Sequence, residues 1–398
     1  MTAPLTGLVL SGGGARGAYE AGVVAGIVDV LNVRRSDSAP FQVFAGTSVG
    51  AINASFYAAH GEQGDLGAAA LTQVWRDLRI EAHVRIDAMR LLGVRRGLAR
   101  LLRGASAHLG PSVLDPAPLD DVVTRAIPWH QLNVNVADGT VKALVIAALE
   151  VASGRTTMFA QLAPGRTFEP SRDVRRRVVV AQISAAHVLA SAAIPAVFPA
   201  RRIDGTWYCD GGLRFNTPIA PAIRAGADRL VVVSLMHRPE APVEVPLVEY
   251  PNPIFLLGKV LNALLLDPVN YDLQVLERFN RLIEVLEQTL SPEDLARVHA
   301  VTRATRGMAY RRLETLVFRP SRDLGRMASD HLRVRSVRNE LGWIGSWLLR
   351  RAARHDATWE DDLASYVLFD GGFAERLMAV GHADALARAV DIRRFFGG

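Results

Sequence analysis

Cysteine is almost absent from the sequence: Cys209 is the only one among 398 residues. A lone cysteine excludes a disulfide within the chain and is typical of proteins that work in a reducing compartment. Cys209 adjoins Asp210 but has no recognisable base to activate its thiol. We therefore interpret it as a buried packing residue.

Long apolar runs are also absent. The longest, residues 254–266, is interrupted by Lys259 and Asn262 and is shorter than the roughly 20 residues that span a bilayer. Residues 5–10 are too few for the apolar region of a secretory signal, and they run directly into glycines. We therefore expect a cytoplasmic protein that reaches membranes only by peripheral contact.

The sequence shows no convincing cluster of histidine, cysteine and acidic residues with metal-ligand spacing, so we expect neither a metal nor another cofactor. Hydrophobic residues make up 49% and charged residues 22%, which is typical of a globular protein. The net charge of +6 favours anionic partners, either membranes or nucleic acid. Because no basic run is interleaved with aromatic residues, nucleic-acid binding is not expected.

A Gly-x-Ser-x-Gly stretch is centred on Ser48. Residues 41–45 before it predict a buried strand, and residues 51–59 after it predict a helix. This order is typical of a nucleophile elbow, in which Gly46 and Gly50 leave room for a tight turn and the serine stands at its tip. The helix N-terminus favours a developing oxyanion there. The alternative is an ordinary strand-to-helix turn.

A glycine-rich loop, residues 11–17, follows the first predicted strand. Gly12, Gly14 and Gly17 match the dinucleotide fingerprint Gly-x-Gly-x-x-Gly, which needs an acidic residue at the end of the second strand. Asp37 has about the right spacing but lies before that strand, which ends at the serine elbow instead. The other use of such a loop is an oxyanion hole, because adjacent glycines let backbone N–H groups converge on a small anion. Parallel strands would bring both loops to one edge of the sheet.

The remaining chain alternates predicted strands and helices. Before residue 238, strands are predicted at 141–149, 156–160 and 229–235, and helices at 18–31, 66–78, 119–126 and 178–190. Beyond it, helices are predicted at 254–290, 292–315, 343–354 and 363–389, with one strand at 316–318. Leucines and arginines alternate at helical spacing over residues 91–103, which predicts a basic amphipathic helix for a membrane surface or a lid. The alternative is a surface helix packed on the core.

Two Asp-Gly-Gly triplets occur in the chain. Asp210 opens the first, directly after a predicted hairpin, and a carboxylate at such a strand end is well placed to face a cleft. Asp370 opens the second, which lies between helical patterns. We interpret the second triplet as a helix break.

Together these motifs resemble the patatin-like phospholipase family, most closely its bacterial cytoplasmic members. The glycine loop is similar to that family's oxyanion loop, the Ser48 stretch to its nucleophile elbow, and the Asp210 triplet to the one that carries its catalytic aspartate. Residues 191–199 resemble the proline-containing block before that aspartate. The resemblance covers about residues 5–235.

The resemblance implies a serine–aspartate dyad, with Ser48 as nucleophile and Asp210 as base. Gly46, Gly50, Gly211 and Gly212 would support these two residues. The oxyanion hole would be formed around Gly12, Gly13, Gly14, Ala15, Arg16, Gly17 and Val49, with the N–H groups of Gly13, Gly14 and Val49 as donors and Arg16 positioning the loop.

The fold we predict is a three-layer α/β/α core with a mostly parallel central sheet, over residues 1–238. A mainly helical region follows over residues 239–398. The predicted function is a lipid acyl hydrolase of the phospholipase A or lysophospholipase type, acting on phospholipid or another lipid ester through an acyl-enzyme. The alternative is a catalytically silent lipid- or membrane-binding protein of the same fold.

The order Ser48, Asp210, His237 also matches the triad of α/β-hydrolases. Two features argue against that triad. The serine follows only one strand–helix unit, and the oxyanion glycines end the first strand. We therefore favour the dyad and interpret His237 as a surface histidine.

Overall fold

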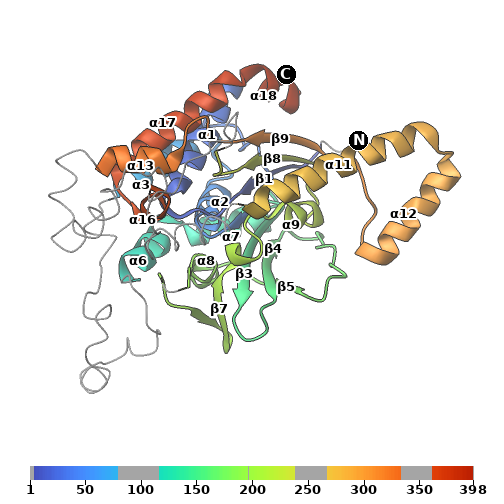
Figure 1. Cartoon of the computed structure of the whole chain (residues 1–398), viewed down its shortest axis with the longest axis horizontal. Coiled ribbons are helices and arrows are strands. Elements are labelled where there is room, and N and C mark those ends of the chain that lie inside the picture. Colours follow the sequence, from blue (N-terminus) through green and yellow to red (C-terminus); the bar gives the residue numbers. More distant parts are fainter. Residues whose placement is uncertain (1–3, 79–115, 196, 238–266, 333–360, 398) are drawn as a thin grey trace, which may run out of the picture.

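A computed structural model of the chain describes residues 4–78, 116–195, 197–237, 267–332 and 361–397 (Figure 1). The predicted basic helix over residues 91–103 and the predicted helix over 343–354 lie outside these residues.

One mixed sheet forms the centre of the molecule, in the order β5-β4-β3-β2-β1-β8-β9, with the β6–β7 hairpin joined to β3. Strands β1, β2, β3, β8 and β9 run parallel, whereas β4 and β7 run antiparallel to β3. The bounds are β1 Thr6–Leu10, β2 Val43–Thr47, β3 Ala143–Glu150, β4 Thr156–Leu162, β5 Arg176–Val180, β6 Arg201–Ile203, β7 Thr206–Asp210, β8 Arg229–Val233 and β9 Glu314–Phe318.

Helices cover both faces of this sheet, so the predicted three-layer α/β/α fold is confirmed (Figure 1). Strands β1 and β2 are buried along their whole length, as expected where a parallel sheet is covered on both faces. Side chains of alternate strand residues enter two separate apolar clusters, Leu8 and Phe44 on one face and Val9 and Ala45 on the other.

The larger cluster is covered mainly by α1 (Ala18–Leu31), α2 (Val49–Ala59), α3 (Leu66–Arg76), α6 (Ala117–Ala126), α7 (Trp129–Ala137), α17 (Gly371–Ala387) and α18 (Ala389–Phe396). The smaller cluster is covered by α9 (Ile219–Arg224) and the first turns of α11 (Asp267–Thr289).

Parts of the chain beyond residue 238 are built into these layers. Strand β9, which was predicted over 316–318, extends the sheet beside β8. Helix α17 lies along α1, where Gly22 permits a close approach: a Cβ at Gly22 would stand 2.1 Å from the carbonyl oxygen of Met378. Such backbone proximity joins the C-terminal helices to the N-terminal layer. A domain boundary at 238 stays a prediction.

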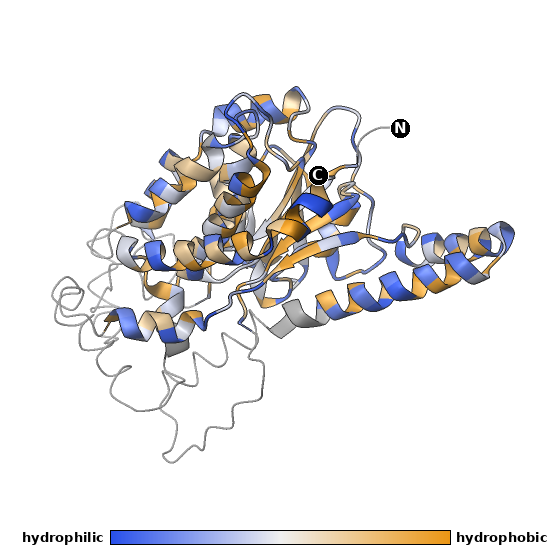
Figure 2. Cartoon of the chain, turned by 90° about the horizontal axis from the view of Figure 1, so that it is seen from above, coloured by the Kyte–Doolittle hydropathy of each residue, from blue (hydrophilic) through white to orange (hydrophobic). Residues whose placement is uncertain are grey.

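Helices α11 and α12 (Pro292–Arg306) form a hairpin that projects from the body of the molecule (Figure 2). Ser291 caps α12 by accepting a hydrogen bond from the Asp294 N–H group at 3.2 Å. No residue of α12 is buried. Among the described residues, no helix is both long and apolar enough to cross a bilayer.

Three sequence predictions need correction. The helix predicted over 292–315 ends at Arg306, where Gly307 adopts a left-handed conformation, and residues 314–315 belong to β9. Residues 178–190 were predicted as one helix, but the segment begins in β5 and only then forms α8 (Ala185–Ser191). Residues 178–180 are three valines, which suit a strand as well as a helix, and β4 supplies the partner. The predicted helix over 363–389 is divided into α16 (Asp361–Val367), α17 and α18.

Candidate active site

Ser48 occupies a strained turn between β2 and α2. Its φ of 56° lies in the left-handed region, which a residue with a side chain rarely adopts. The turn closes only because its flanking residues lack side chains: a Cβ at Gly46 would stand 2.1 Å from the Gly50 carbonyl oxygen, and one at Gly50 would stand 2.4 Å from that of Leu10. The fold therefore holds Ser48 at a tight tip, and this strain is typical of functional sites.

Ser191 fixes the backbone of this turn. The Ser48 N–H group donates to Ser191 Oγ at 2.9 Å, and that hydroxyl donates to the Ala147 carbonyl oxygen at 2.6 Å. The Ser48 N–H group therefore already has an acceptor and is not free to donate to an oxyanion. Sequence reasoning noted the block that begins at Ser191 but gave this residue no role.

Strand β3 brings Asp210 to Ser48. Thr47, the last residue of β2, pairs with Ala147, and Asp210, the last residue of β7, pairs with the next residue, Ala148. The ends of β2 and β7 therefore meet head-on along one side of β3, about one residue rise apart, ~3.3 Å. This register places the serine and the aspartate face to face.

The Asp210 carboxyl is completely buried. Its Oδ1 accepts a hydrogen bond from the Gly212 N–H group at 2.7 Å, whereas Oδ2 is buried without a partner of standard hydrogen-bond geometry. Burial raises the pKa of Asp210 to about 7, against the lowering effect of hydrogen bonds from the Ser48 side chain and the Gly212 backbone. A carboxyl with this pKa can take up and return a proton near neutral pH.

The glycine loop packs directly on the serine elbow. A Cβ at Gly12 would stand 3.0 Å from the Ser48 Cβ, and one at Gly17 would stand 2.4 Å from Val49 Cγ2. Three N–H groups of the loop are already engaged: that of Ser11 donates to Glu20 Oε1 at 2.8 Å, that of Gly12 to the Asn216 carbonyl oxygen and that of Arg16 to the Gly13 carbonyl oxygen, the last two at 3.2 Å.

Asn216 fastens the loop to the Asp210 side of the site. Its carbonyl oxygen accepts from Gly12, and its Nδ2 donates back to the Gly12 carbonyl oxygen at 3.0 Å. The side chain is buried, with 1% exposed. Sequence reasoning missed this residue. The available signal was an amide side chain four positions after the glycines that follow Asp210.

Arg16 connects the loop to the C-terminal part of the chain. Its Nε donates to Ser365 Oγ at 2.7 Å, and its guanidinium lies 4.4 Å from the centre of the Tyr366 ring. Gly14, at φ 57°, touches the same helix, since a Cβ there would stand 2.1 Å from the Tyr366 carbonyl oxygen. The Arg16 side chain thus contacts α16, an arrangement suited to positioning the loop.

A buried carboxyl supports both ends of the glycine loop. Glu20 Oε1 accepts from the Ser11 N–H group at 2.8 Å, and Oε2 accepts from Asn53 Nδ2 at 2.9 Å. Asn53 Nδ2 also donates to the Gly17 carbonyl oxygen at 3.0 Å. Burial raises the pKa of Glu20 well above its usual range, against the lowering effect of the hydrogen bonds from Asn53 and Ser11. No local sequence pattern identifies Glu20 or Asn53.

Three other residues considered in the sequence analysis, His237, Asp37 and Asp370, have their described contacts outside this site. Nδ1 of the half-buried His237 is 2.9 Å from the Pro320 carbonyl oxygen, and the described contacts include none between His237 and Ser48 or Asp210. Asp37 lies in a surface turn, where its carboxylate accepts from the Arg34 N–H group. Asp370 caps α17 by accepting from the Phe373 N–H group, so the second triplet is a helix boundary.

Cys209 is buried, as predicted, and burial together with Asp210 raises the pKa of its thiol to about 11. The thiol is therefore neutral at pH 7. Among the residues that the structure describes, no three histidine, cysteine or acidic side chains group closely enough to hold a metal ion.

An apolar pocket opens beside the elbow. It encloses about 630 Å³, including space open to solvent, and lies between α2, α3 and α6. Val49, which follows the serine, forms part of its wall with Phe56, Trp75, Val122 and Ala126. Its apolar lining is typical of sites for an apolar ligand.

An α/β protein with a serine elbow, a buried carboxyl and a glycine loop belongs to the broad class of hydrolase folds. The model of the patatin-like phospholipase family matches residues 8–223, more than half of the chain. The chain belongs to this family, which supports lipid hydrolysis as the general class of activity.

A curated relative is the cGAMP-activated phospholipase of Pseudomonas aeruginosa (strain BWHPSA011 / Pa011), 30% identical over 214 residues. The match covers 53% of each chain, so this chain spans about half of that relative's length. Among solved structures, VipD from Legionella pneumophila aligns with 13% identity and a TM-score of 0.29, covering 80% of this chain and 62% of VipD. Human GIVD cytosolic phospholipase A2 in complex with methyl gamma-linolenyl fluorophosphonate aligns with 14% identity and a TM-score of 0.41, covering 99% and 58%.

Proposed function

We propose that this protein is a lipid acyl hydrolase whose nucleophile is Ser48 and whose base is Asp210. The observation that carries the proposal is the head-on meeting of β2 and β7 along β3, which sets the serine against a buried carboxyl of pKa about 7. An ester reaction needs a nucleophile, a base and an anion trap in one place.

In the first half-reaction, Ser48 Oγ adds to the carbonyl carbon of the ester while its proton passes to Asp210. The tetrahedral adduct then breaks its bond to the leaving alcohol, which takes the proton from Asp210. In the second half-reaction, Asp210 accepts a proton from water as the hydroxide adds to the acyl carbon. Collapse releases the acid and returns the proton to Ser48 Oγ.

The oxyanion of both adducts needs N–H donors. Because the amides of Ser48, Gly12 and Arg16 are engaged, we assign this role to the N–H groups of Gly13, Gly14 and Val49. The loss of one such donor lowers the rate by about 10²–10³ in other hydrolases.

The acyl chain would enter the apolar pocket, because Val49 belongs both to the pocket wall and to the proposed oxyanion hole. A long-chain lipid ester is therefore the substrate class we propose, and the family description favours a phospholipid. The relative's name states activation by cGAMP, so we include that compound as a candidate activator in the test.

The test is labelling with a fluorophosphonate, which reacts with activated serines, followed by mass mapping of the adduct. Wild type is compared with Ser48→Ala and with Ser153→Ala, a control in the exposed turn between β3 and β4. We expect one adduct on Ser48 in wild type and in the control, and none in Ser48→Ala.

An adduct on another serine would overturn the assignment. The reaction is repeated with cGAMP and with anionic vesicles, so that an inactive resting state is distinguished from a silent site. No adduct under any of these conditions, on folded protein, would favour the catalytically silent lipid-binding protein instead.

A further inference from the structure

A second pocket lies at the opposite edge of the sheet from Ser48. It is formed by the segment after β4, the end of α9 and the segment after α12, next to the beginnings of β8 and β9. It encloses about 960 Å³, including space open to solvent. A five-residue strand spans about 16 Å, so this pocket is separate from the serine elbow. Its charged lining consists of Arg166, Glu169, Arg224, Arg303 and Arg311.

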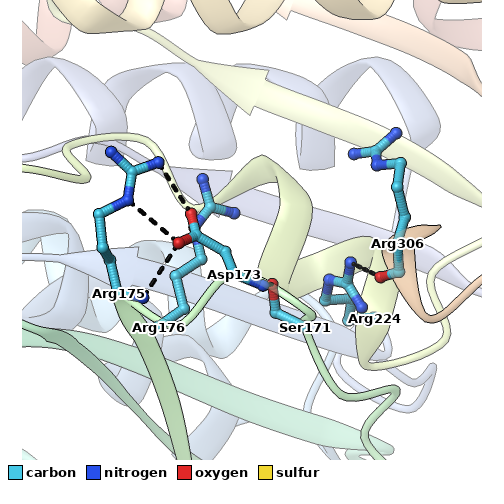
Figure 3. A network of polar contacts seen from close by, with 6 residues as sticks. All are labelled: Ser171, Asp173, Arg175, Arg176, Arg224 and Arg306. Carbon is cyan, nitrogen blue, oxygen red and sulfur yellow. Dashed lines mark hydrogen bonds and ion pairs between the residues drawn. The ribbon is translucent and has the colours of Figure 1, made fainter.

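Arg224 is the buried arginine of this pocket's lining, with 5% of its surface exposed. Its Nη1 donates to the carbonyl oxygens of Glu169 at 3.0 Å and Pro170 at 2.6 Å. Its Nη2 donates to the carbonyl oxygen of Arg306 at 2.8 Å (Figure 3). A guanidinium has five N–H donors, so two remain beyond these three bonds. The segments around the pocket therefore hold a charged group that still has hydrogen-bonding capacity.

Positive charge is concentrated here beyond what nearby carboxylates offset. Burial, and then the charges of Arg306 and Arg176, lower the pKa of Arg224. Arg166 and Arg303 are exposed and form no ion pair with any described residue, whereas Arg311 is paired with Asp228. Glu169 is the single carboxylate of the lining.

Two arginines of the same segments outside the pocket have carboxylate partners. Arg297, one turn and a half before Arg303 on α12, pairs with Glu293 and Asp294. Arg175 pairs with Asp173 (Figure 3). The pocket residues Arg166 and Arg303 have no such partner among the described residues, which leaves their charges for another anion.

The walls of the pocket are fixed by close backbone contact. Gly307 ends α12 with a φ of 88°, and a Cβ there would stand 2.3 Å from the Pro170 carbonyl oxygen. The end of α12 can therefore dock against the segment after β4, beside Arg224. Three segments distant in sequence are joined here by these contacts.

We propose that this pocket binds a phosphate-bearing anion through Arg166, Arg224 and Arg303. Guanidinium groups match phosphate oxygens in charge and in paired hydrogen-bond geometry. The phosphate can belong to a soluble compound or to a lipid headgroup. The proposal goes beyond the hydrolase function and does not depend on it, because it concerns binding at the other edge of the sheet.

Binding of inorganic pyrophosphate is measured by calorimetry on the full chain at low salt. The same protein is then tested for sedimentation with phosphatidylcholine vesicles, with and without phosphatidic acid. Arg166→Ala and Arg303→Ala are compared with Arg297→Ala, which removes the same charge from the same helix outside the pocket. All three side chains are exposed, so the variants should fold, which circular dichroism checks.

We expect saturable pyrophosphate binding that weakens about tenfold in each pocket variant and stays unchanged in Arg297→Ala. Binding only to vesicles with phosphatidic acid, lost in the pocket variants, would support the proposal with a lipid as the source. Equal weakening in Arg297→Ala would overturn it in favour of general charge attraction. Absence of both pyrophosphate and vesicle binding would overturn it as well.

Discussion

At the scale of single residues, Asp210 carries the most informative property. Its carboxyl is fully buried beside the serine, and burial raises its pKa to about 7. The proposed base must be deprotonated before Ser48 can transfer its proton. The pH dependence of the reaction therefore reports this one group.

We predict that kcat/KM for a soluble ester falls about tenfold per pH unit below pH 7 and levels off above it. The physical reason is protonation of Asp210 in the free enzyme, since its raised pKa lies in this range. The measurement is a pH–rate profile with an uncharged substrate. If kcat/KM instead fell only near pH 4, the ordinary range of an aspartate, the role of Asp210 as a buried base would be contradicted.

We also predict that Asp210→Asn is inactive but more stable than wild type at pH 8. The folded pKa lies above the unfolded one, so this group lowers stability progressively as the pH rises from about 4 to about 7. The effect has an upper limit of about 4 kcal/mol at pH 8 and disappears near pH 4. Thermal unfolding at both pH values measures it, with the exposed Glu314→Gln as control. Equal stability of variant and wild type at pH 8 would argue against a destabilising buried charge.

At the scale of elements, the glycine loop depends on helices far away in the sequence. Glu20 of α1 and Asn53 of α2 hold its two ends, while α16 contacts its centre through Arg16 and Tyr366. An oxyanion hole works only when its donors are fixed before the reaction. The C-terminal region therefore contributes to the site without supplying any of its proposed catalytic groups.

We predict that Arg16→Lys lowers kcat about tenfold and leaves KM nearly unchanged. Lysine keeps the charge but lacks the planar group that donates to Ser365 and stacks on Tyr366. Steady-state kinetics and the rate of fluorophosphonate labelling measure the change. Arg76→Lys, the same substitution at a half-exposed ion pair of α3, serves as control. A rise in KM alone would show that Arg16 contacts the substrate.

At the scale of the whole molecule, the two pockets occupy opposite edges of the sheet. The apolar one adjoins the elbow at the carboxyl ends of the parallel strands, and the basic one lies where β8 and β9 begin. A lipid chain and an anion could therefore be bound at the same time without contact between them.

We predict that Ala126→Phe, which narrows the apolar pocket, changes the preferred chain length of the substrate. Each methylene that no longer enters loses about 0.8 kcal/mol of burial, roughly fourfold in kcat/KM. Long-chain esters should therefore lose activity while short ones keep it. The measurement is the ratio of kcat/KM over a series of acyl chains, with Ala296→Phe on the exposed face of α12 as control. An unchanged ratio would show that the acyl chain binds elsewhere.

Local pattern sufficed to predict the sheet, the elbow and the glycine loop. Glycines on both sides of Ser48 and a buried strand before it encode a tight turn, because backbone conformation is a local property. The valines at residues 178–180 were misassigned because their periodicity fits a strand or a helix, and only the pairing with β4 decides between them.

The sequence by itself determined the family, the three-layer core and the candidates Ser48 and Asp210. Only the tertiary structure decided how they meet, since the register of β2 and β7 on β3 joins residues far apart in the chain. It also determined the hydrogen bonds by which Ser191, Asn216 and Glu20 hold the site. The grouping of arginines in the pocket that contains Arg224 likewise follows only from the tertiary structure. The reason is physical: periodicity and turn geometry depend on neighbouring residues, whereas burial, hydrogen-bond partners and pKa arise only when distant segments pack together.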